Sequence, residues 1–375
     1  MINIYIDSTF YAGSILAIIF YLLGKYKTEF DRKYYKIFIA IFFFYLIGVS
    51  IALYVGTIHE NASNLIYDDF RASTILISML ATIGLLSRIK QVDKFKKILT
   101  CLAVIFLFCI LFVRILETNL LGNLVKITSV QLLNVTFLGF YGLYLITEKK
   151  YKKFGQLIAV MAWTVLVISF TKFYFIPIIL LPLTWILIVT RNFNRVKQLV
   201  GILLIIIIIT SSLFFFRDNI TSFATSYPTF NAYWHGRVVD GNLLSDGGLR
   251  DGSRFMIWND LLQQFYKSPW LGIGYGARPT FLNVADHNIF IFFLVRFGAP
   301  IFITLFILTF GLFVHMLYFV RIGRISRFVL FSLFLTYFLT SAIDPKPYAI
   351  ITNSLLTAAI AGVILNTKSK TVFLS

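Results

Sequence analysis

The sequence is poor in charged residues and in histidine and cysteine, the residues that most often mark a catalytic or metal site. Only 13% of its 375 residues are charged, about half of the roughly 25% typical of soluble domains, while 59% are hydrophobic. It has four histidines and two cysteines. Cys101 and Cys109, eight residues apart on one apolar run, match neither a disulfide framework nor a metal-ligand spacing, so we expect two buried small hydrophobic residues. An ordinary soluble enzyme and a disordered chain are both excluded.

What charge there is has one dominant sign, with a formal net charge of +18. Because it accompanies apolar runs of membrane-spanning length, it indicates a polytopic membrane protein and not a nucleic-acid-binding one. The prediction is an all-α transmembrane bundle of about eleven spans with one large outer loop containing short helices. Eight spans fall in 1–216, the loop is 217–298, and three spans fall in 299–375. The expected spans are 8–24, 37–55, 72–87, 98–113, 129–146, 154–171, 173–190, 198–216, 299–320, 328–343 and 348–365.

The basic residues predict the orientation of this bundle. Alternate connections hold 22 of the 34 Lys and Arg residues and four of the 16 acidic residues, which leaves 12 of each sign on the other face. Cytoplasmic loops carry such a basic excess, so the N-terminus is expected in the periplasm and the C-terminus in the cytoplasm. The first span is expected to be a retained helix and not a signal peptide, because the first basic residue, Lys25, follows it.

The long outer loop is patterned. Three Asp-Gly steps between 240 and 252 are turn signals, since the calcium-loop spacing is missing. Ser253 is expected to cap a helix that runs to about Lys267. Its apolar stripe of Phe255, Trp258, Leu262 and Phe265 is expected to face the membrane surface or the bundle. Arg254, in the first turn, is slightly unfavourable with the helix dipole, which favours a ligand-binding role.

A glycine-rich run follows this helix. Gly272, Gly274 and Gly276 alternate with larger residues, and such glycines let backbone N–H groups approach an anion closely. The spacing is not that of a dinucleotide-binding fingerprint, so a glycine-rich turn is the default interpretation.

A short apolar helix is expected at 289–297, ended by Gly298 and too short to cross a bilayer. His287 lies at its N-terminus. The helix dipole there favours a neutral imidazole, which suits a general base, although Asp286 acts in the opposite direction.

Each of these residues also has a simpler interpretation. The imidazoles of His59, His235 and His315 compete for the role of general base, and His315 is expected to form a hydrogen bond between packed helices. The loop's arginines can pair with its six aspartates, and Lys172 can extend to the membrane interface. These arginines are Arg217, Arg237, Arg250, Arg278 and Arg296.

The order of the motifs favours a functional interpretation. Arg254-x3-Trp258, then Ser268-Pro269-x2-Gly272-x-Gly274-x-Gly276, then His287-Asn288 and Gly298, all after eight spans, resembles the loop signature of the bacterial O-antigen ligase and polymerase superfamily. The match covers about 253–300. Members also carry a Ser-Arg-Gly-like step two spans earlier. The matching place here reads Ser169-Phe170-Thr171-Lys172-Phe173, in which lysine replaces arginine and the small residue is lost.

The resemblance implies a glycosyltransferase-type enzyme of the bacterial cytoplasmic membrane. Its expected donor is a glycan linked through pyrophosphate to undecaprenol, and its acceptor is a sugar hydroxyl. Arg254 and Lys172 would stabilise the leaving pyrophosphate and His287 would be the base; no cofactor, metal or nucleic acid is expected. Membrane lipids and a chain-length regulator protein are further candidate partners. The expected substrate-binding residues are Asn288, Gly272, Gly274, Gly276, Trp258 and Arg278.

Three functions remain open. The first is a polymerase of lipid-linked oligosaccharide repeat units, favoured by the compact length and the weakened Ser-Arg-Gly step. The second is an O-antigen ligase that transfers the finished glycan to lipid A-core. The third is a flippase or transporter for the lipid-linked sugar, which the lack of charge at the centres of the spans counts against.

Overall fold

The chain folds into packed helices. The computed structural model describes residues 13, 15–24, 29–119, 129–168, 175–189, 252–278, 288–318, 324–343 and 351–366. Every regular element in these ranges is a helix. The long helices are α2 (Glu29–Ile58), α3 (Ser63–Leu86), α4 (Val92–Asn119), α5 (Ser129–Ile146), α6 (Lys152–Ile168), α7 (Phe175–Val189), α13 (Ala299–Tyr318), α14 (Arg324–Ile343) and α16 (Ile351–Asn366). The shorter ones are η1 (Lys149–Tyr151), α11 (Gly252–Tyr266) and α12 (Ile289–Phe297).

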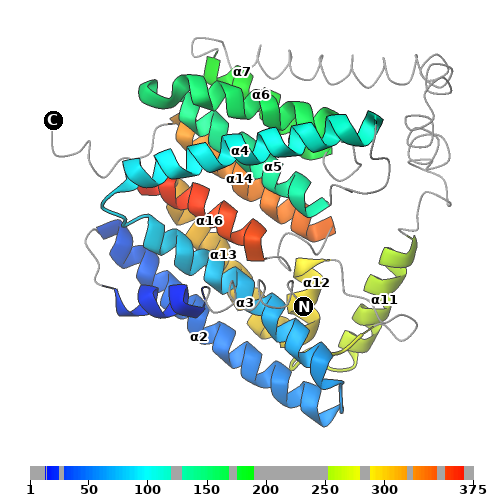
Figure 1. Cartoon of the computed structure of the whole chain (residues 1–375). Coiled ribbons are helices and arrows are strands. Elements are labelled where there is room, and N and C mark those ends of the chain that lie inside the picture. The colour runs from blue at the N-terminus through cyan, green and yellow to red at the C-terminus, as the bar shows by residue number, and fades with distance from the viewer. Residues whose placement is uncertain are drawn as a thin grey trace.

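The long helices form two groups with α16 between them (Figure 1). One group holds α4, α5, α6, α7 and α14, the other holds α2, α3 and α13, and α16 packs on both α3 and α5. The most extensive contact is between α5 and α6, where glycines face each other. A Cβ atom on Gly142 would lie 2.8 Å from the carbonyl oxygen of Gly155, so only glycine allows this approach. Small residues at helix contacts are typical of membrane bundles.

Four of the described helices are long and apolar enough to cross a membrane: Phe30–Ile58, Ser63–Leu86, Val92–Val113 and Ala299–Tyr318. Shorter apolar helices cover Leu132–Ile146, Ile325–Ser341 and Asn353–Asn366. These helices indicate a membrane-embedded helical protein. The expected span 198–216, residues 217–251 of the loop and the count of eleven spans lie outside what the described residues test.

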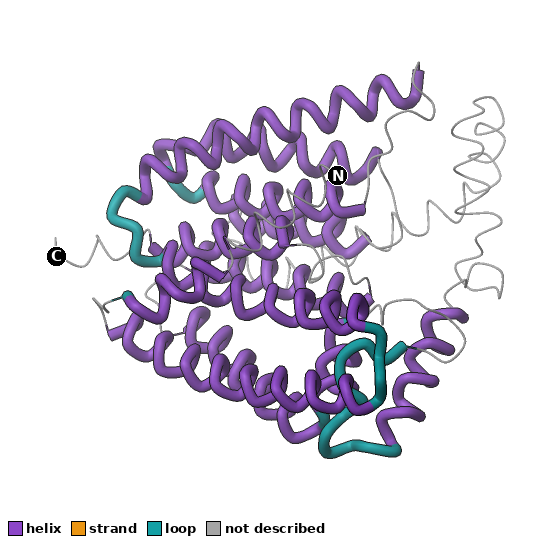
Figure 2. The backbone as a smooth tube through the Cα atoms, turned by 60° about the horizontal axis from the view of Figure 1, so that its bottom comes forward, coloured by secondary structure: helices purple, strands orange, loops and turns teal. Residues whose placement is uncertain are grey.

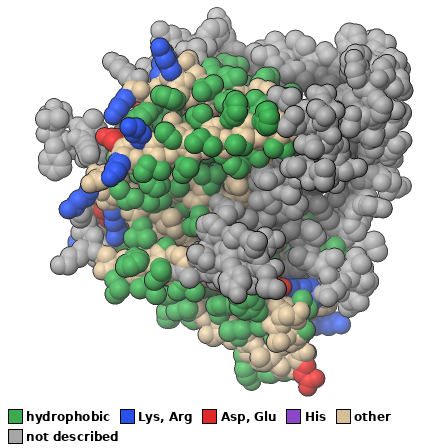
Figure 3. All heavy atoms as spheres, in the orientation of Figure 1, with side chains coloured by type: hydrophobic (Ala, Val, Ile, Leu, Met, Phe, Trp, Pro, Cys, Tyr) green, Lys and Arg blue, Asp and Glu red, His purple; other side chains and the backbone are tan. Residues whose placement is uncertain are grey.

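The outer surface of α4 is apolar between Ile98 and Phe112. Five large hydrophobic side chains on it are at least half exposed: Ile98, Leu102, Ile105, Phe108 and Phe112. Cys101 and Cys109 lie on the same helix and are also exposed, so the expectation that both are buried is wrong. Their run is apolar although it faces outward, as is expected of a helix that contacts lipid. Figure 3 shows this apolar covering over one face of the molecule.

The two ends of the bundle differ in charge. α2 begins, α3 ends and α4 begins at one end, here called the basic end, where Arg88 pairs with Asp31 and Lys96 with Glu148. Several Lys and Arg side chains lie along this edge, at the left of Figure 3, and others lie at the opposite end. Loops join the helices at both ends (Figure 2). At the opposite end, here called the turn end, the glycine-rich segment 268–278 packs on α2 and α3.

One helix boundary differs from expectation in a way that matters for the site. The sequence predicts a span over 72–87, but α3 begins at Ser63. The extra turns carry Asp68, Asp69 and Arg71, which the hydropathy pattern excludes from a span. The helix continues through them because Asp69 finds buried partners at the turn end.

Candidate functional site

The candidate site is at the turn end and begins with the three glycines. Gly272, Gly274 and Gly276 all adopt positive φ, at 75°, 74° and 81°. A Cβ atom on Gly274 would lie 2.9 Å from the carbonyl oxygen of Ala52 and would also clash with the backbone nitrogen of Gly56. The glycines therefore allow a close approach, as expected, but the surfaces that they approach belong to the same chain: the end of α12 for Gly272, α2 for Gly274, and Asn61 with Ile66 for Gly276.

The backbone amides of this turn are engaged within the protein. The N–H of Tyr275 donates to the carbonyl of Ala52 at 2.8 Å, and the N–H of Gly276 donates to Asp69 Oδ2 at 2.8 Å. A glycine-rich turn does hold an anion here, but that anion is the carboxylate of Asp69.

Asp69 gathers two arginines as well. Arg296 Nε donates to Oδ2 at 2.8 Å, and Arg278 Nη1 lies 3.0 and 3.1 Å from the two carboxylate oxygens. The side chains are 0% exposed for Arg296, 7% for Asp69 and 14% for Arg278. Both arginines thus form ion pairs, as the simpler interpretation expects, but the partner that the structure describes is Asp69 on α3. Of the loop's six aspartates, only Asp260 lies within the described residues.

Tyr275 links the turn to the interior of the bundle. Its hydroxyl is 2.7 Å from Ser73 Oγ, which is 3.2 Å from the hydroxyl of Tyr45. Its carbonyl accepts from Asn61 Nδ2 at 2.7 Å. Burial raises the pKa of the Tyr275 phenol well above its usual range, so it remains protonated and able to donate.

The short helix α12 matches its prediction, with Gly298 at φ 80° ending it. Asn288 is its N-cap: Oδ1 accepts from the backbone N–H groups of Phe290 at 2.8 Å and Ile291 at 3.1 Å. The oxygen of Asn288 is therefore committed to the helix. If Asn288 binds substrate as expected, the contact is made by its amide nitrogen Nδ2.

The other predicted loop helix, α11, begins at Gly252, so Ser253 lies inside it and not at its cap. Its buried face consists of Ile257, Leu261 and Phe265, with Trp258 packed beside them. Leu262, expected on the buried stripe, is only partly buried, because the contact surface is centred about one residue earlier. This face covers Ile273, Ala277 and Val295, so α11 packs over the glycine-rich turn and α12.

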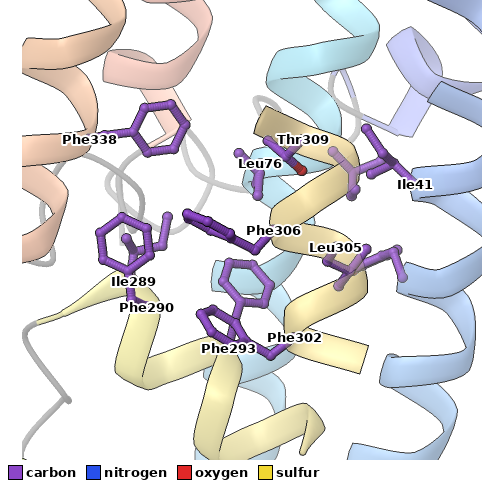
Figure 4. Close-up of a pocket in the computed structure, with 12 residues that line it drawn as sticks. Ile41, Leu76, Ile289, Phe290, Phe293, Phe302, Leu305, Phe306, Thr309 and Phe338 are labelled. Atoms are coloured by element: carbon purple, nitrogen blue, oxygen red, sulfur yellow. The ribbon is translucent and has the colours of Figure 1, made fainter. Parts of the chain in front are cut away.

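An apolar cleft begins where α12 begins. It holds about 490 Å³ of empty space, counting the part open to the outside. Aromatic rings from three helices surround it in Figure 4: Phe290 and Phe293 from α12, Phe302 and Phe306 from α13, and Phe338 from α14. Phe306 is 48% exposed, so the cleft reaches the apolar outer surface of α13.

Three predicted residues cannot be placed in this geometry. Lys172 and His287 lie outside the described residues, and Arg254 lies in the first turn of α11 with its side chain outside them. The structure does bring Arg278, the three glycines, Trp258 and α12 together at one end of the bundle. Within the described ranges, no group of three or more His, Cys, Asp or Glu residues is placed to hold a metal ion.

Sequence reasoning missed Asp69, and it treated Arg296 only as a possible ion-pair partner. The signal was present, since an ionisable residue beside an apolar span is expensive unless it has a partner. What the sequence lacks is the identity of that partner, which lies more than 200 residues away.

A comparison with models of protein families finds none that matches the chain, and a comparison with curated proteins finds no match either.

Proposed function

We propose that the protein is a polymerase of the bacterial cytoplasmic membrane that joins undecaprenyl-pyrophosphate-linked oligosaccharide repeat units at the periplasmic face. The observation that carries this proposal is the placement of α12 between an apolar cleft and a cluster of charges. Phe290 and Phe293 line the cleft, and Arg296, in the last turn, binds Asp69 and so joins the cluster that holds Arg278.

The dimensions suit a lipid-linked substrate. A nine-residue helix is about 13 Å long, so an apolar surface and a cationic one lie within about that distance. A polyprenyl pyrophosphate has the same two parts, an apolar chain and an anionic headgroup. The aromatic cleft suits the chain, and the arginine cluster suits the headgroup.

The proposed reaction is a single displacement. A hydroxyl of the acceptor sugar attacks the anomeric carbon of the donor, the bond from that carbon to the pyrophosphate oxygen breaks, and undecaprenyl pyrophosphate leaves. His287, the residue before the Asn288 cap, takes the proton of the attacking hydroxyl. Arg254 and Lys172 stabilise the charge that develops on the leaving group, and the anomeric configuration inverts.

Deletion of the gene in its own host tests the proposal against its alternatives. Loss of a polymerase leaves lipid A-core carrying a single repeat unit. Loss of a ligase leaves bare core with long glycan still attached to undecaprenol. Loss of a flippase leaves single units on the cytoplasmic side. Either of the last two patterns, read from a gel of the surface glycan and from extracted lipid-linked material, rejects the proposed polymerase.

The catalytic assignment has its own test in the complemented deletion strain. His287→Ala is expected to insert normally and to abolish long chains. His59→Ala is the matched control, because His59 is exposed at the end of α2 and outside the proposed chemistry. A normal ladder of chain lengths with His287→Ala would contradict the assignment.

A further inference from the structure

The Asp69 cluster contains two positive charges and one negative charge. Arg296 and Asp69 are almost entirely buried, and the side chain of Arg278 is 14% exposed. The carboxylate balances one guanidinium, so these three described side chains together carry an excess of one positive charge. Most of the cluster is buried. A net charge that is removed from water is energetically unfavourable unless another group compensates it.

The two arginines differ in how they are used. Arg296 donates Nε to Asp69 and Nη2 to the carbonyl of Ala277 at 2.7 Å, and it has no exposed surface. Arg278 uses Nη1 for all three of its hydrogen bonds, two to Asp69 and one to the carbonyl of Ala277 at 2.9 Å. Within the described part of the chain, Nε and Nη2 of Arg278 have no partner.

Among the described residues, no carboxylate other than Asp69 forms an ion pair with Arg278. Asp260 is the nearest carboxylate on α11, and the amide nitrogen of Gln264 lies between it and the carbonyl of Arg278, at 2.8 Å and 3.1 Å. Asp68 precedes Asp69 on α3 but is exposed. The free edge of the Arg278 guanidinium has two donors in a planar array, the geometry that matches two oxygens of a phosphate.

We propose that Arg278 is a phosphate-binding residue, held in position by the buried pair of Asp69 and Arg296. Asp69 fixes one edge of the guanidinium and leaves the other open. Arg296 neutralises Asp69, so the charge of Arg278 remains for the ligand. The identification of that phosphate as the pyrophosphate of a lipid-linked sugar rests on the proposed function, whereas the binding site itself rests on the cluster.

Direct binding to the full chain tests the site. The protein is placed in nanodiscs of zwitterionic phosphatidylcholine and titrated with geranylgeranyl pyrophosphate and with geranylgeraniol, which lacks the phosphates. Arg278→Gln is expected to weaken the first at least roughly tenfold and to leave the second unchanged. Arg278→Lys, which keeps the charge but loses the fork, is expected to lie between wild type and Arg278→Gln. Equal affinity of wild type and Arg278→Gln for the pyrophosphate overturns the proposal.

The positioning role of Asp69 needs a measurement that a purely structural role would not change. That measurement is the ratio of the affinities for geranylgeranyl pyrophosphate and geranylgeraniol. Asp69→Asn is expected to lower the ratio, because Arg278 loses its anchor, and a variant that lowers both affinities equally overturns the role. Asp69→Glu supplies the same comparison if the asparagine variant does not fold. The control is Lys267→Gln, an exposed cation at the end of α11, which is expected to leave the ratio unchanged.

Two further titrations identify the source of the phosphate. Inorganic pyrophosphate is expected to compete with geranylgeranyl pyrophosphate for the site. Phosphatidylglycerol added to the nanodiscs is expected not to compete. Competition by phosphatidylglycerol that disappears in Arg278→Gln would make the ligand a bilayer headgroup and overturn the substrate assignment. If binding of the pyrophosphate depends on Arg278 but the protein makes no polymer, only the proposed function is rejected. Polymer formation with binding that does not depend on Arg278 rejects only the site.

Discussion

Asp69 shows how much one buried side chain organises at the turn end. Its two oxygens receive hydrogen bonds from Gly276, Arg278 and Arg296, which come from the glycine-rich turn and from α12. Removing one partner of a buried ion pair typically costs about 3–5 kcal/mol, because the remaining charge stays buried without compensation. The carboxylate therefore ties the outer turn to α3 as well as orienting the arginines.

Gly274 gives a prediction for stability at the same scale. Gly274→Ala is expected to destabilise the protein by about 2–4 kcal/mol, because alanine is strained at φ 74° and its Cβ would overlap α2. The measurement is thermal unfolding in detergent, followed by the fraction that remains monodisperse.

Gly311→Ala is the control for this prediction. Gly311 lies on an exposed face of α13, and a Cβ atom added to it would have no other atom within 4 Å. Alanine there is expected to be neutral or to stabilise by up to about 1 kcal/mol. Equal melting temperatures for wild type and Gly274→Ala would show that the turn does not lie against α2.

The glycines mark the limit of what the sequence predicts about single residues. Their alternation correctly indicates a close backbone approach, and Gly298 correctly ends α12. A positive φ is a local property that glycine reveals in any sequence. The object being approached is not local, and so neither the contact with Gly56 nor the bond from Gly276 to Asp69 was predictable.

At the scale of elements, hydrophobic periodicity located α12 and the long helices well but failed where polar residues enter a helix. The start of α3 was placed nine residues late because Asp68, Asp69 and Arg71 interrupt the apolar run. The predicted apolar stripe of α11 differs from its buried face by about one residue, because the packing of α11 on α12 decides which side chains are covered. Both errors arise from tertiary contacts that a linear pattern does not contain.

The cleft beside α12 gives a prediction that belongs to this scale. Thr309 lines it, and Thr309→Phe is expected to fill part of the space without changing the charged cluster. Each methylene of the polyprenyl chain that no longer fits costs about 0.8 kcal/mol, so excluding two raises KM for the undecaprenyl donor about tenfold. The measurement is KM for that donor and for a donor with a shorter isoprenoid chain, which is expected to change less.

The matched control is Gly311→Phe, which adds a similar ring two residues further along α13, at an exposed position where an added Cβ atom would meet no other helix within 4 Å. It is expected to leave KM for both donors unchanged. An equal rise of KM for long and short donors with Thr309→Phe would show that the cleft does not hold the distal part of the chain.

At the scale of the whole molecule, the division of charge between the ends of the bundle is the feature on which the proposed function depends. Three of the six connections that the sequence assigns to one face, 25–36, 88–97 and 148–153, meet at one end through the Arg88–Asp31 and Lys96–Glu148 pairs. The candidate site lies at the other end, where Asn61 and Asp69 contact 275–278. A periplasmic reaction requires that the basic end face the cytoplasm.

That orientation can be measured with single cysteines in a background of Cys101→Ala and Cys109→Ala. Ser63→Cys lies at the turn end and Lys150→Cys at the basic end, and both positions are exposed. A membrane-impermeant maleimide added to cells with a permeabilised outer membrane is expected to label Ser63→Cys. Lys150→Cys is expected to react only after the inner membrane is broken.

The basic end is expected to face the cytoplasm because the anionic surface of the cytoplasmic leaflet stabilises each nearby Lys or Arg by about 1 kcal/mol. The basic end carries several such residues at the start of α2, between α3 and α4, and around η1. Inverting the bundle would lose this stabilisation for each of these residues. The reverse labelling pattern would place Arg278 and α12 in the cytoplasm and would exclude periplasmic polymerisation, whatever the chemistry of the cluster.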